Sequence, residues 1–256
     1  MKLTKEGLEK QKQERIGEIR YNKHGSKMKI HEYIDSMNVV IKFENGYTTK
    51  NTYNAFKKEE IKNPYDKSVF NKGYIGEGKY KVSTNRVFNN IYKLWKRMMG
   101  RCYDISYINK YPTYKDCSVC EEWHNYQNFA KWHDENYYKI EGEEIHLDKD
   151  ILIKGNKIYS PDTCIFVPDR INYLFIKANK SRGKYPIGVN YNKQSKKFIA
   201  TCTPKYLGLF NTPEEAFEVY KNCKENLIRK IANEYKDKIP QKLYDVLINY
   251  QVEITD

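Results

Sequence analysis

The chain has 256 residues, enough for one large domain or two to three small ones, and 46 Lys and Arg against 33 Asp and Glu give it a net charge of +13. That balance favours a polyanionic partner, either nucleic acid or an anionic surface. No apolar run is long enough to span a membrane and residues 1–18 lack the apolar core of a signal peptide, so we expect an intracellular protein whose six cysteines are thiols or metal ligands.

The first 66 residues are predicted to form a small β-rich module. Residues 1–14 have the composition of a charged helix or arm, and short strands follow from Ile16 to about Phe56. Asn45-Gly46 is typical of a tight hairpin turn. Several short strands in so small a segment predict an SH3-like barrel, which is either a structural cap or a module that touches DNA.

A glycine-rich connector follows, with Gly73, Gly76 and Gly78 close to Lys79 and Lys81. A phosphate-binding loop of the P-loop type would end in Gly-Lys-Ser or Gly-Lys-Thr after a strand, and this segment has neither feature. We therefore predict a linker that carries some basic charge, and no nucleotide cofactor.

A helix is predicted from Phe88 to Cys102, because Ile91, Leu94 or Trp95, Met98 and Cys102 recur at three- and four-residue steps. Basic residues flank this apolar stripe: Lys93, Lys96, Arg97 and Arg101. The Met and Trp positions are interpreted as core.

Two cysteines separated by two residues, Cys117 and Cys120, have the spacing of a zinc site, because their thiolates can reach one tetrahedral ion. Cys102 and Cys164 would complete a set of four ligands, and His124 is a reserve ligand. The alternative is that these cysteines are core thiols without metal.

The candidate catalytic groups lie in residues 144–172. As a strand, Ile145 to Ile151 would place His146, Asp148 and Asp150 on one face. Two turns and a short apolar strand are predicted next, and a helix begins near Pro168 and carries the amide of Asn172. The predicted layout is strand, turn, strand, helix; the alternative is a hairpin whose Asp residues only solvate a turn.

The C-terminal part changes in charge, since residues 179–208 contain no Asp or Glu. We predict three strands and a helix, with Thr212 as N-cap and Glu215 completing a capping box, and a last helix from Gln241 to Tyr250. The basic run is either a nucleic-acid surface or a solvated face.

The chain contains LDKD, GNKIYSP, Cys164 and Asn172 in the order of the pattern LDRxD…GxYSPxNCxW…N. Residues 144–172 therefore resemble the ββα-metal site of phage-type HNH nucleases, which have this pattern. The sequence YKLWKRMMGRCY and the following Cys, Trp and Phe spacing also fit that family. The resemblance implies a DNA endonuclease that uses Mg²⁺ or Mn²⁺, with Asp148 and Asn172 as metal ligands.

The chain departs from that pattern at two positions. Lys149 stands where most members have the general-base His, and a lysine of ordinary pKa cannot accept a proton at pH 7. Thr163 stands where an Asn usually holds the loop. His146, two positions before Asp148, or a metal-bound water is the candidate replacement for the base.

The pattern GV.Y....KF.A…LG.F.T.EEA..Y resembles the AP2 DNA-binding domain, whose three-stranded sheet lies in the major groove with a helix behind it. The resemblance implies that exposed sheet residues, Thr201 among them, face DNA. The DNA-binding residues expected on this basis are Arg182, Lys184, Asn190, Tyr191, Lys193, Lys196, Lys197 and Lys205.

We thus expect an α+β protein with three parts: a β-barrel module over residues 1–66, an HNH-like nuclease domain over 67–178, and an AP2-like domain with C-terminal helices over 179–256. The expected function is that of a phage or mobile-element DNA endonuclease, related to homing endonucleases, acting on double-stranded DNA in the cytoplasm of a bacterial host. The alternative is a DNA-binding regulator on an inactive HNH scaffold: Lys149 and Thr163 favour it, whereas His146, Asp148 and Asn172 favour the enzyme.

Overall fold

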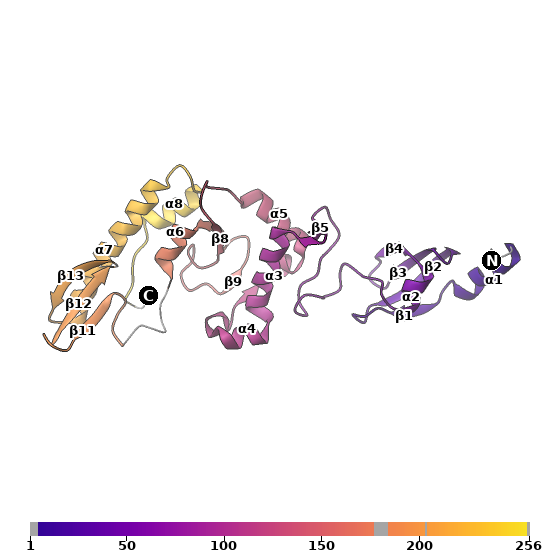
Figure 1. The fold of residues 1–256 in the computed structure, drawn as a ribbon, viewed down its shortest axis with the longest axis horizontal. Helices are drawn as coiled ribbons and strands as arrows, with labels where there is room; N and C mark the ends of the chain where they lie inside the picture. Colours follow the sequence, from indigo (N-terminus) through magenta and orange to yellow (C-terminus); the bar gives the residue numbers. More distant parts are fainter. Residues whose placement is uncertain (1–4, 177–183, 203, 255–256) are drawn as a thin grey trace. The chain divides into compact units, whose positions relative to one another are not determined.

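The computed structural model describes residues 5–176, 184–202 and 204–254, and it is a mixed α+β structure with several small sheets (Figure 1). The α+β class is therefore confirmed. The chain forms two compact units, Met1–Asp134 and Glu135–Asp256. Residues 67–134 belong to the first unit and residues 135–178 to the second, and the division into three domains stays a prediction.

The first unit begins with α1 (Lys5–Arg15) and a four-stranded antiparallel sheet in the order β1 (Ile19–Tyr21), β2 (Lys27–Asp35), β3 (Asn38–Phe43) and β4 (Thr48–Asn51). The expected Asn45-Gly46 turn joins β3 to β4, with Gly46 at a φ of 91°. Alternate residues such as Met28, Ile30 and Ile41 are fully buried, as the strand period requires.

This sheet is open, and in the part of the chain that the structure describes no barrel is closed. The expectation of a closed SH3-like barrel is corrected on this point. The chain leaves β4 after four residues and enters α2 (Tyr53–Lys57), which Thr52 caps by accepting the Ala55 N–H at 3.1 Å. Phe56 of α2 is fully buried in the same core, so a helix residue rather than a further strand completes it.

The rest of the first unit contains a small hairpin, three helices, of which the last ends two residues beyond Asp134, and three further short elements. The bounds are β5 (Ser83–Thr84), β6 (Val87–Phe88), α3 (Asn90–Tyr103), α4 (Ile105–Lys110), β7 (Ser118–Val119) and α5 (Tyr126–Asn136), with 3₁₀ turns at Pro112–Tyr114 and Glu121–His124. The predicted helix over residues 88–102 is thus present as α3, and Trp95 is buried with its Nε1 donating to the Trp123 carbonyl at 2.7 Å.

The glycine-rich connector is packed rather than loose. The side chain of Gln127 accepts from the Tyr80 N–H and donates to the Tyr80 carbonyl, both at 3.0 Å. A Cβ at Gly78 would lie 2.3 Å from the Gln127 side chain, and one at Gly73 would lie 2.8 Å from the Trp95 ring. These glycines therefore allow close approach of backbone to buried side chains, which the linker interpretation did not anticipate.

The second unit places a strand pair with a short helix against a three-stranded sheet with two helices. The bounds are β8 (Ile145–Asp148), β9 (Ile158–Tyr159), β10 (Ile165–Pro168), α6 (Asp169–Asn172), a 3₁₀ turn at Tyr173–Phe175, β11 (Val189–Asn192), β12 (Lys197–Cys202), β13 (Lys205–Phe210), α7 (Pro213–Glu234) and α8 (Gln241–Ile248). α7 contacts all three strands of the sheet β11–β12–β13, and α8 contacts α7, beside which it is drawn in Figure 1.

One hydrophobic core joins these parts. Val167 and Ile171 of the strand–helix pair are fully buried in the same cluster as Ala200 of the sheet, Ala232 of α7 and Leu243 of α8. The predicted capping box opens α7: Thr212 accepts the Glu215 N–H at 3.2 Å and Glu215 accepts the Thr212 N–H at 3.4 Å. The capping residues were therefore enough to predict where α7 begins.

Among the described residues, no helix combines the length and the apolar character needed to cross a bilayer.

Candidate active site and nucleic-acid interface

The candidate active site is built on β8, β10 and α6. β8 and β10 pair antiparallel, with Asp148 opposite Ile165 and His146 opposite Val167. β8 ends at Asp148, whose Oδ1 accepts the N–H groups of Asp150 at 2.8 Å and Ile151 at 2.7 Å. This side-chain turn bends the chain away from the strand direction.

Asp150 is consequently not on the strand face that the alternating pattern predicted. It lies in the bend after β8, half of its side chain is exposed, and its Oδ2 accepts from Lys149 Nζ at 3.1 Å. His146 and Asp148 are both on β8 and two residues apart, so they do share a face.

The carboxyl group of Asp148 is partly removed from water. Burial is the main cause that raises its pKa above the ordinary value, and the neighbouring carboxylate of Asp150 raises it further. The two backbone N–H groups and Lys149 act in the opposite direction without cancelling the rise. Carboxylate and amide oxygens are donors that Mg²⁺ accepts, so the residue types of Asp148 and Asn172 suit the ion that the HNH resemblance implies, and this ion stays a prediction.

Lys149, at the position of the missing general base, has a structural environment. It is buried, and its Nζ donates to Asp150 Oδ2 and to the Asn156 carbonyl, each at 3.1 Å. Lys149 is thus engaged in an ion pair and a loop hydrogen bond, which is a structural role. The general base that the HNH resemblance implies has to come from another residue, and this stays a prediction.

The loop between β8 and β10 is held by Asn156 and Thr163. Asn156 Nδ2 donates to the carbonyls of Lys149 at 2.6 Å and Ile158 at 2.7 Å, and Thr163 Oγ1 donates to the same Ile158 carbonyl at 2.7 Å. Thr163 thus still bonds the loop backbone, and Asn156, whose Oδ1 also accepts the Ile158 N–H at 3.2 Å, adds three bonds that the sequence had not indicated. Gly155-Asn156 had signalled only a turn.

His146 is hydrogen-bonded to Asp169, the first residue of α6, with 3.1 Å between Nε2 and Oδ1. An ionised carboxylate at Nε2 favours the tautomer that carries its proton there, which leaves Nδ1 able to accept one. About a third of the His146 side chain is exposed. Asp169 was also missed; the only sequence signal was an acidic residue in the first turn of a helix.

Asn172 is the last residue of α6 and is half-buried. It lies three residues after Asp169, so the two side chains are on the same side of the helix turn. His146 and Asp148 lie on β8, and Asn172 lies on the short helix that contacts this strand. That Asn172 joins His146 and Asp148 in one site stays a prediction.

All six cysteines are thiols rather than halves of disulfides. Cys102, Cys117 and Cys120 lie in the first unit and Cys164 in the second; burial raises the pKa of the Cys120 thiol and raises that of Cys164 to about 12. Within the ranges that the structure describes, no three His, Cys, Asp or Glu side chains are grouped so that they could hold a metal ion. Structural zinc through these four cysteines stays a prediction, as does the core-thiol alternative.

The reserve ligand His124 has another partner. Its Nε2 lies 3.1 Å from the hydroxyl of Tyr103, which also accepts the Val119 N–H at 3.0 Å. Burial is the main cause that lowers the pKa of His124, so the ring is kept neutral in this packed position.

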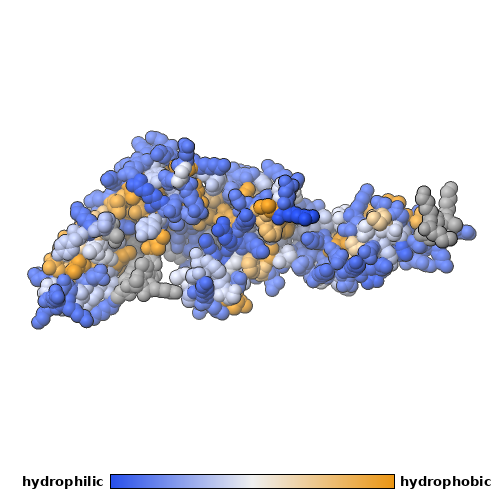
Figure 2. All heavy atoms as spheres, viewed as in Figure 1, coloured by the Kyte–Doolittle hydropathy of each residue, from blue (hydrophilic) through white to orange (hydrophobic). Residues whose placement is uncertain are grey.

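The sheet β11–β12–β13 has one face on α7 and one face away from it. Val189 pairs with Ala200 and both are buried, so the next residues, Asn190 paired with Ile199, point to the opposite face. Leu209, paired with Ile199, is 41% exposed. Hydrophobic residues lie among hydrophilic ones over this sheet in Figure 2, and the outer face is thus partly apolar.

The basic residues expected to contact DNA gather at the hairpin between β11 and β12. Asn192 Oδ1 accepts the N–H groups of Gln194 at 2.9 Å and Ser195 at 3.2 Å, which shapes the turn. The exposed lysines of this hairpin are Lys193, Lys196 and Lys197. Three cations in five residues form a compact site for phosphates.

The other expected DNA-binding residues are more dispersed. Lys184 and Lys205 are exposed at the start of the module and at the start of β13. The ring of Tyr191 lies 5.2 Å from that of Phe198, which packs on the core, so Tyr191 is on the helix side of the sheet and not on the outer face. Arg182 lies outside the described residues.

Comparison with models of known protein families, with curated proteins and with solved structures finds no match for this chain.

Proposed function

We propose that this protein is a metal-dependent DNA endonuclease of the HNH type. The observation that carries the proposal is the His146–Asp169 hydrogen bond beside Asp148: a base, the carboxylate that orients it, and a carboxylate of raised pKa meet at one strand–helix junction. In this proposal β8, β10 and α6 form the ββα-metal fold, β11–β13 with α7 form an AP2-like module, and β1–β4 form an SH3-like module.

Each residue has a separate task. Asp148 and Asn172 would hold Mg²⁺ or Mn²⁺, which supplies charge compensation at the scissile phosphate when bound. His146 accepts the proton of the attacking water at Nδ1, while Asp169 keeps the ring in the required tautomer and orientation. Lys149 compensates the charge of Asp150 and, with Asn156, fixes the loop next to Asp148.

The charge distribution supports DNA as the substrate. The net charge of +13 and the hairpin lysines favour phosphate contacts, and the apolar outer residues Ile199 and Leu209 suit contact with thymine methyl groups in the major groove. Affinity would therefore come mainly from the β11–β13 sheet, and catalysis from the β8–α6 region.

The second candidate is a DNA-binding regulator without catalysis. It is favoured by one observation, the engagement of Lys149 in a partly buried ion pair at the position where the family pattern has its base. The two candidates share DNA binding and differ only in chemistry.

Supercoiled plasmid incubated with the full chain and Mg²⁺ or Mn²⁺ separates them. We expect conversion to nicked or linear DNA that EDTA prevents, and a rate lowered by roughly 10²–10⁴-fold in His146→Ala. His31→Ala, at an exposed histidine of β2, is the matched control and should leave the rate unchanged. Tight plasmid binding without cleavage under every metal condition would establish the regulator instead.

Asp148→Ala tests the assignment of the site. We expect loss of cleavage with DNA binding nearly intact, because affinity comes from basic residues elsewhere in the chain. Cleavage that survives Asp148→Ala would place the chemistry outside β8–α6.

A further inference from the structure

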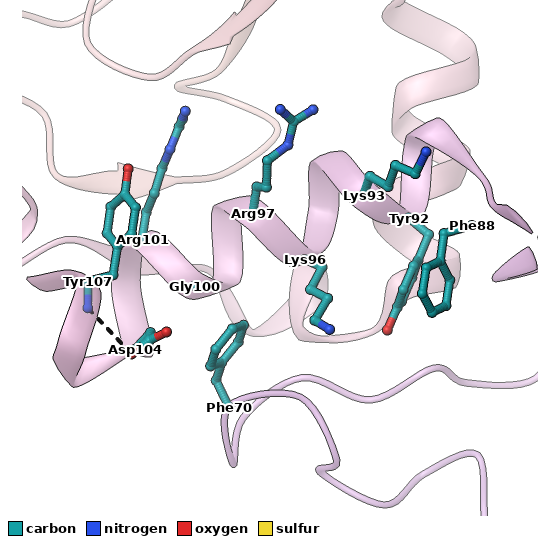
Figure 3. A pocket seen from close by; sticks show the side chains of 10 residues that line it. All are labelled: Phe70, Phe88, Tyr92, Lys93, Lys96, Arg97, Gly100, Arg101, Asp104 and Tyr107. Atoms are coloured by element: carbon teal, nitrogen blue, oxygen red, sulfur yellow. Dashed lines mark hydrogen bonds between the residues drawn. The ribbon is translucent and has the colours of Figure 1, made fainter.

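A second candidate site lies in the first unit, on the outer side of α3. A cavity of about 560 Å³ is formed there by the segment at Phe70, the end of β6, α3 and the start of α4 (Figure 3). This volume lies within the range of small-molecule sites. None of its lining residues belongs to the β8–α6 region or to the β11–β13 sheet.

One wall of the cavity is aromatic. Phe88 is 52% exposed, and its ring lies 5.4 Å from that of Tyr92 at an interplanar angle of 35°. Tyr92 is buried and is held from behind by an edge-to-face contact with Tyr126 at 5.4 Å. Phe88 is therefore an exposed ring on a fixed support, which suits stacking of a planar ligand.

The other wall is basic. Lys93, Arg97 and Arg101 follow one another at four-residue steps, and α3 contains no acidic residue. Like charges at this spacing repel each other, so the row favours an anionic ligand. Arg97 and Arg101 point to the same side of α3 in Figure 3, whereas Lys96 points toward the segment of Phe70. Neither Lys96 nor Arg97 forms an ion pair with a described residue.

The acidic residue of the cavity does not compensate this charge. Asp104 caps α4: its Oδ1 accepts the Ser106 N–H at 2.9 Å and the Ser106 hydroxyl at 2.6 Å. These bonds, the hydroxyl bond first, lower the pKa of Asp104 and hold the carboxylate at the helix end. Asp104 is thus engaged at the start of α4, and Lys96 and Arg97 remain available to an anion.

The floor of the cavity is a constrained aromatic residue. Phe70 has a φ of 52°, which is rare for a bulky side chain, and its ring lies on Gly100. A Cβ at Gly100 would come within 3.1 Å of that ring. Residues held in such conformations are concentrated at functional sites, because the surrounding structure must enforce them.

We propose that this cavity binds an unpaired nucleotide of a single-stranded nucleic acid, with the base stacked on Phe88 and the flanking phosphates held by Lys96 and Arg97. Aromatic stacking combined with a basic groove is the general chemistry of single-strand binding. A base inside a duplex is covered on both faces by its neighbours and cannot reach the Phe88 ring. The site would add recognition of single strands to duplex binding by the β11–β13 sheet, and it does not depend on the proposed cleavage.

The test is fluorescence anisotropy of the full chain with a labelled oligothymidylate of about ten nucleotides. Phe88→Ala should weaken binding roughly five- to 150-fold, the range for one lost stacking contact. Val87→Ala, at a 63% exposed neighbour outside the cavity, is the matched control and should bind as the unmodified protein does. Equal affinity of Phe88→Ala and Val87→Ala would overturn the proposal.

A second variant tests the phosphate contacts. In the double variant Lys96→Ala, Arg97→Ala the dependence of log affinity on log salt should be shallower by about 1.4, or 0.7 for each lost contact with a single strand. Lys110→Ala, an exposed lysine outside the cavity, should leave the slope unchanged. An unchanged slope in the double variant would also overturn the proposal.

Two competitors decide whether the base is recognised. Thymidine 5′-monophosphate should displace the labelled strand at concentrations where inorganic phosphate does not; equal competition would show an anion site without stacking and reject the proposal. The Asp148→Ala variant should bind oligothymidylate normally. Failure of the cleavage assay would therefore leave this test, and its outcome, unaffected.

Discussion

Asn156→Ala is the most direct test of how the loop beside Asp148 is held. Asn156 Nδ2 donates to the Lys149 carbonyl at 2.6 Å and to the Ile158 carbonyl at 2.7 Å, and Asn156 Oδ1 accepts the Ile158 N–H at 3.2 Å; all three bonds disappear in the alanine variant. A typical intramolecular hydrogen bond contributes about 1 kcal/mol net, so three would contribute about 3 kcal/mol. The Ile158 carbonyl keeps the bond from Thr163 Oγ1, and the N–H of the exposed Ile158 can bond water instead, which reduces the expected loss to about 1.5 kcal/mol.

Thermal unfolding followed by far-ultraviolet circular dichroism measures this loss. For a unit of this size a destabilisation of about 1.5 kcal/mol lowers the Tm by roughly 4–8 °C. Asn190→Ala, at an exposed asparagine on the outer face of the β11–β13 sheet, is the matched control and should change stability by less than about 0.5 kcal/mol.

The shared Ile158 carbonyl allows a sharper check with Thr163→Ala. The double variant leaves that carbonyl without either side-chain donor, so its destabilisation should exceed the sum of the single losses by at least about 0.5 kcal/mol. Two results would contradict this reasoning: additive destabilisations of the two single variants, or a Tm of Asn156→Ala equal to that of Asn190→Ala. Either result would show that Asn156 and Thr163 do not hold the loop through the Ile158 carbonyl.

The remaining predictions concern the candidate site, the sheet, the fold and zinc. Asp169→Asn should slow plasmid cleavage by about tenfold, less than His146→Ala, because two thirds of the Asp169 side chain is exposed and the pair is screened by solvent; an effect equal to that of His146→Ala would give Asp169 a larger role. Replacing the three hairpin lysines, Lys193, Lys196 and Lys197, by alanine should make the salt dependence of duplex binding shallower by about 2–3, measured by titration at several salt concentrations; an unchanged slope would remove phosphate binding from this hairpin. Gly188→Ala should lower the free energy of unfolding by more than about 2 kcal/mol, since Gly188 has a φ of 76° and a Cβ would lie 2.1 Å from the Tyr220 ring. Gly142 has a φ of 75° and open space around it, so Gly142→Ala is the control that measures the destabilisation from backbone strain alone. Protein purified without chelator should contain about one zinc per chain and lose stability in EDTA; less than half an equivalent with an unchanged Tm would reject the four-cysteine site.

Elements whose signals are local were predictable from the amino-acid sequence. The residue pattern between Ile16 and Phe56 predicted short strands, and β2 and β3 lie there, because a strand exposes every second side chain to the same face. The Asn45-Gly46 turn and the Thr212–Glu215 capping box were predicted from a few adjacent residues, since their hydrogen bonds join positions no more than four apart. The order strand, strand, helix around His146, Asp148 and Asn172 was predicted for the same reason.

Tertiary structure decided the features that depend on distant residues. The pairing of His146 with Asp169 joins positions 23 residues apart, and nothing in the local pattern around either residue indicates it. The glycines of the connector are explained by the buried Gln127 and Trp95, which come from α5 and α3. Asp150 was misplaced because the strand period was extended past Asp148, whereas the Asp148 carboxylate captures two backbone N–H groups and ends the strand there. Side-chain hydrogen bonds of this kind compete with continued strand pairing. The free energies of the two alternatives differ little, so packing against distant residues decides between them.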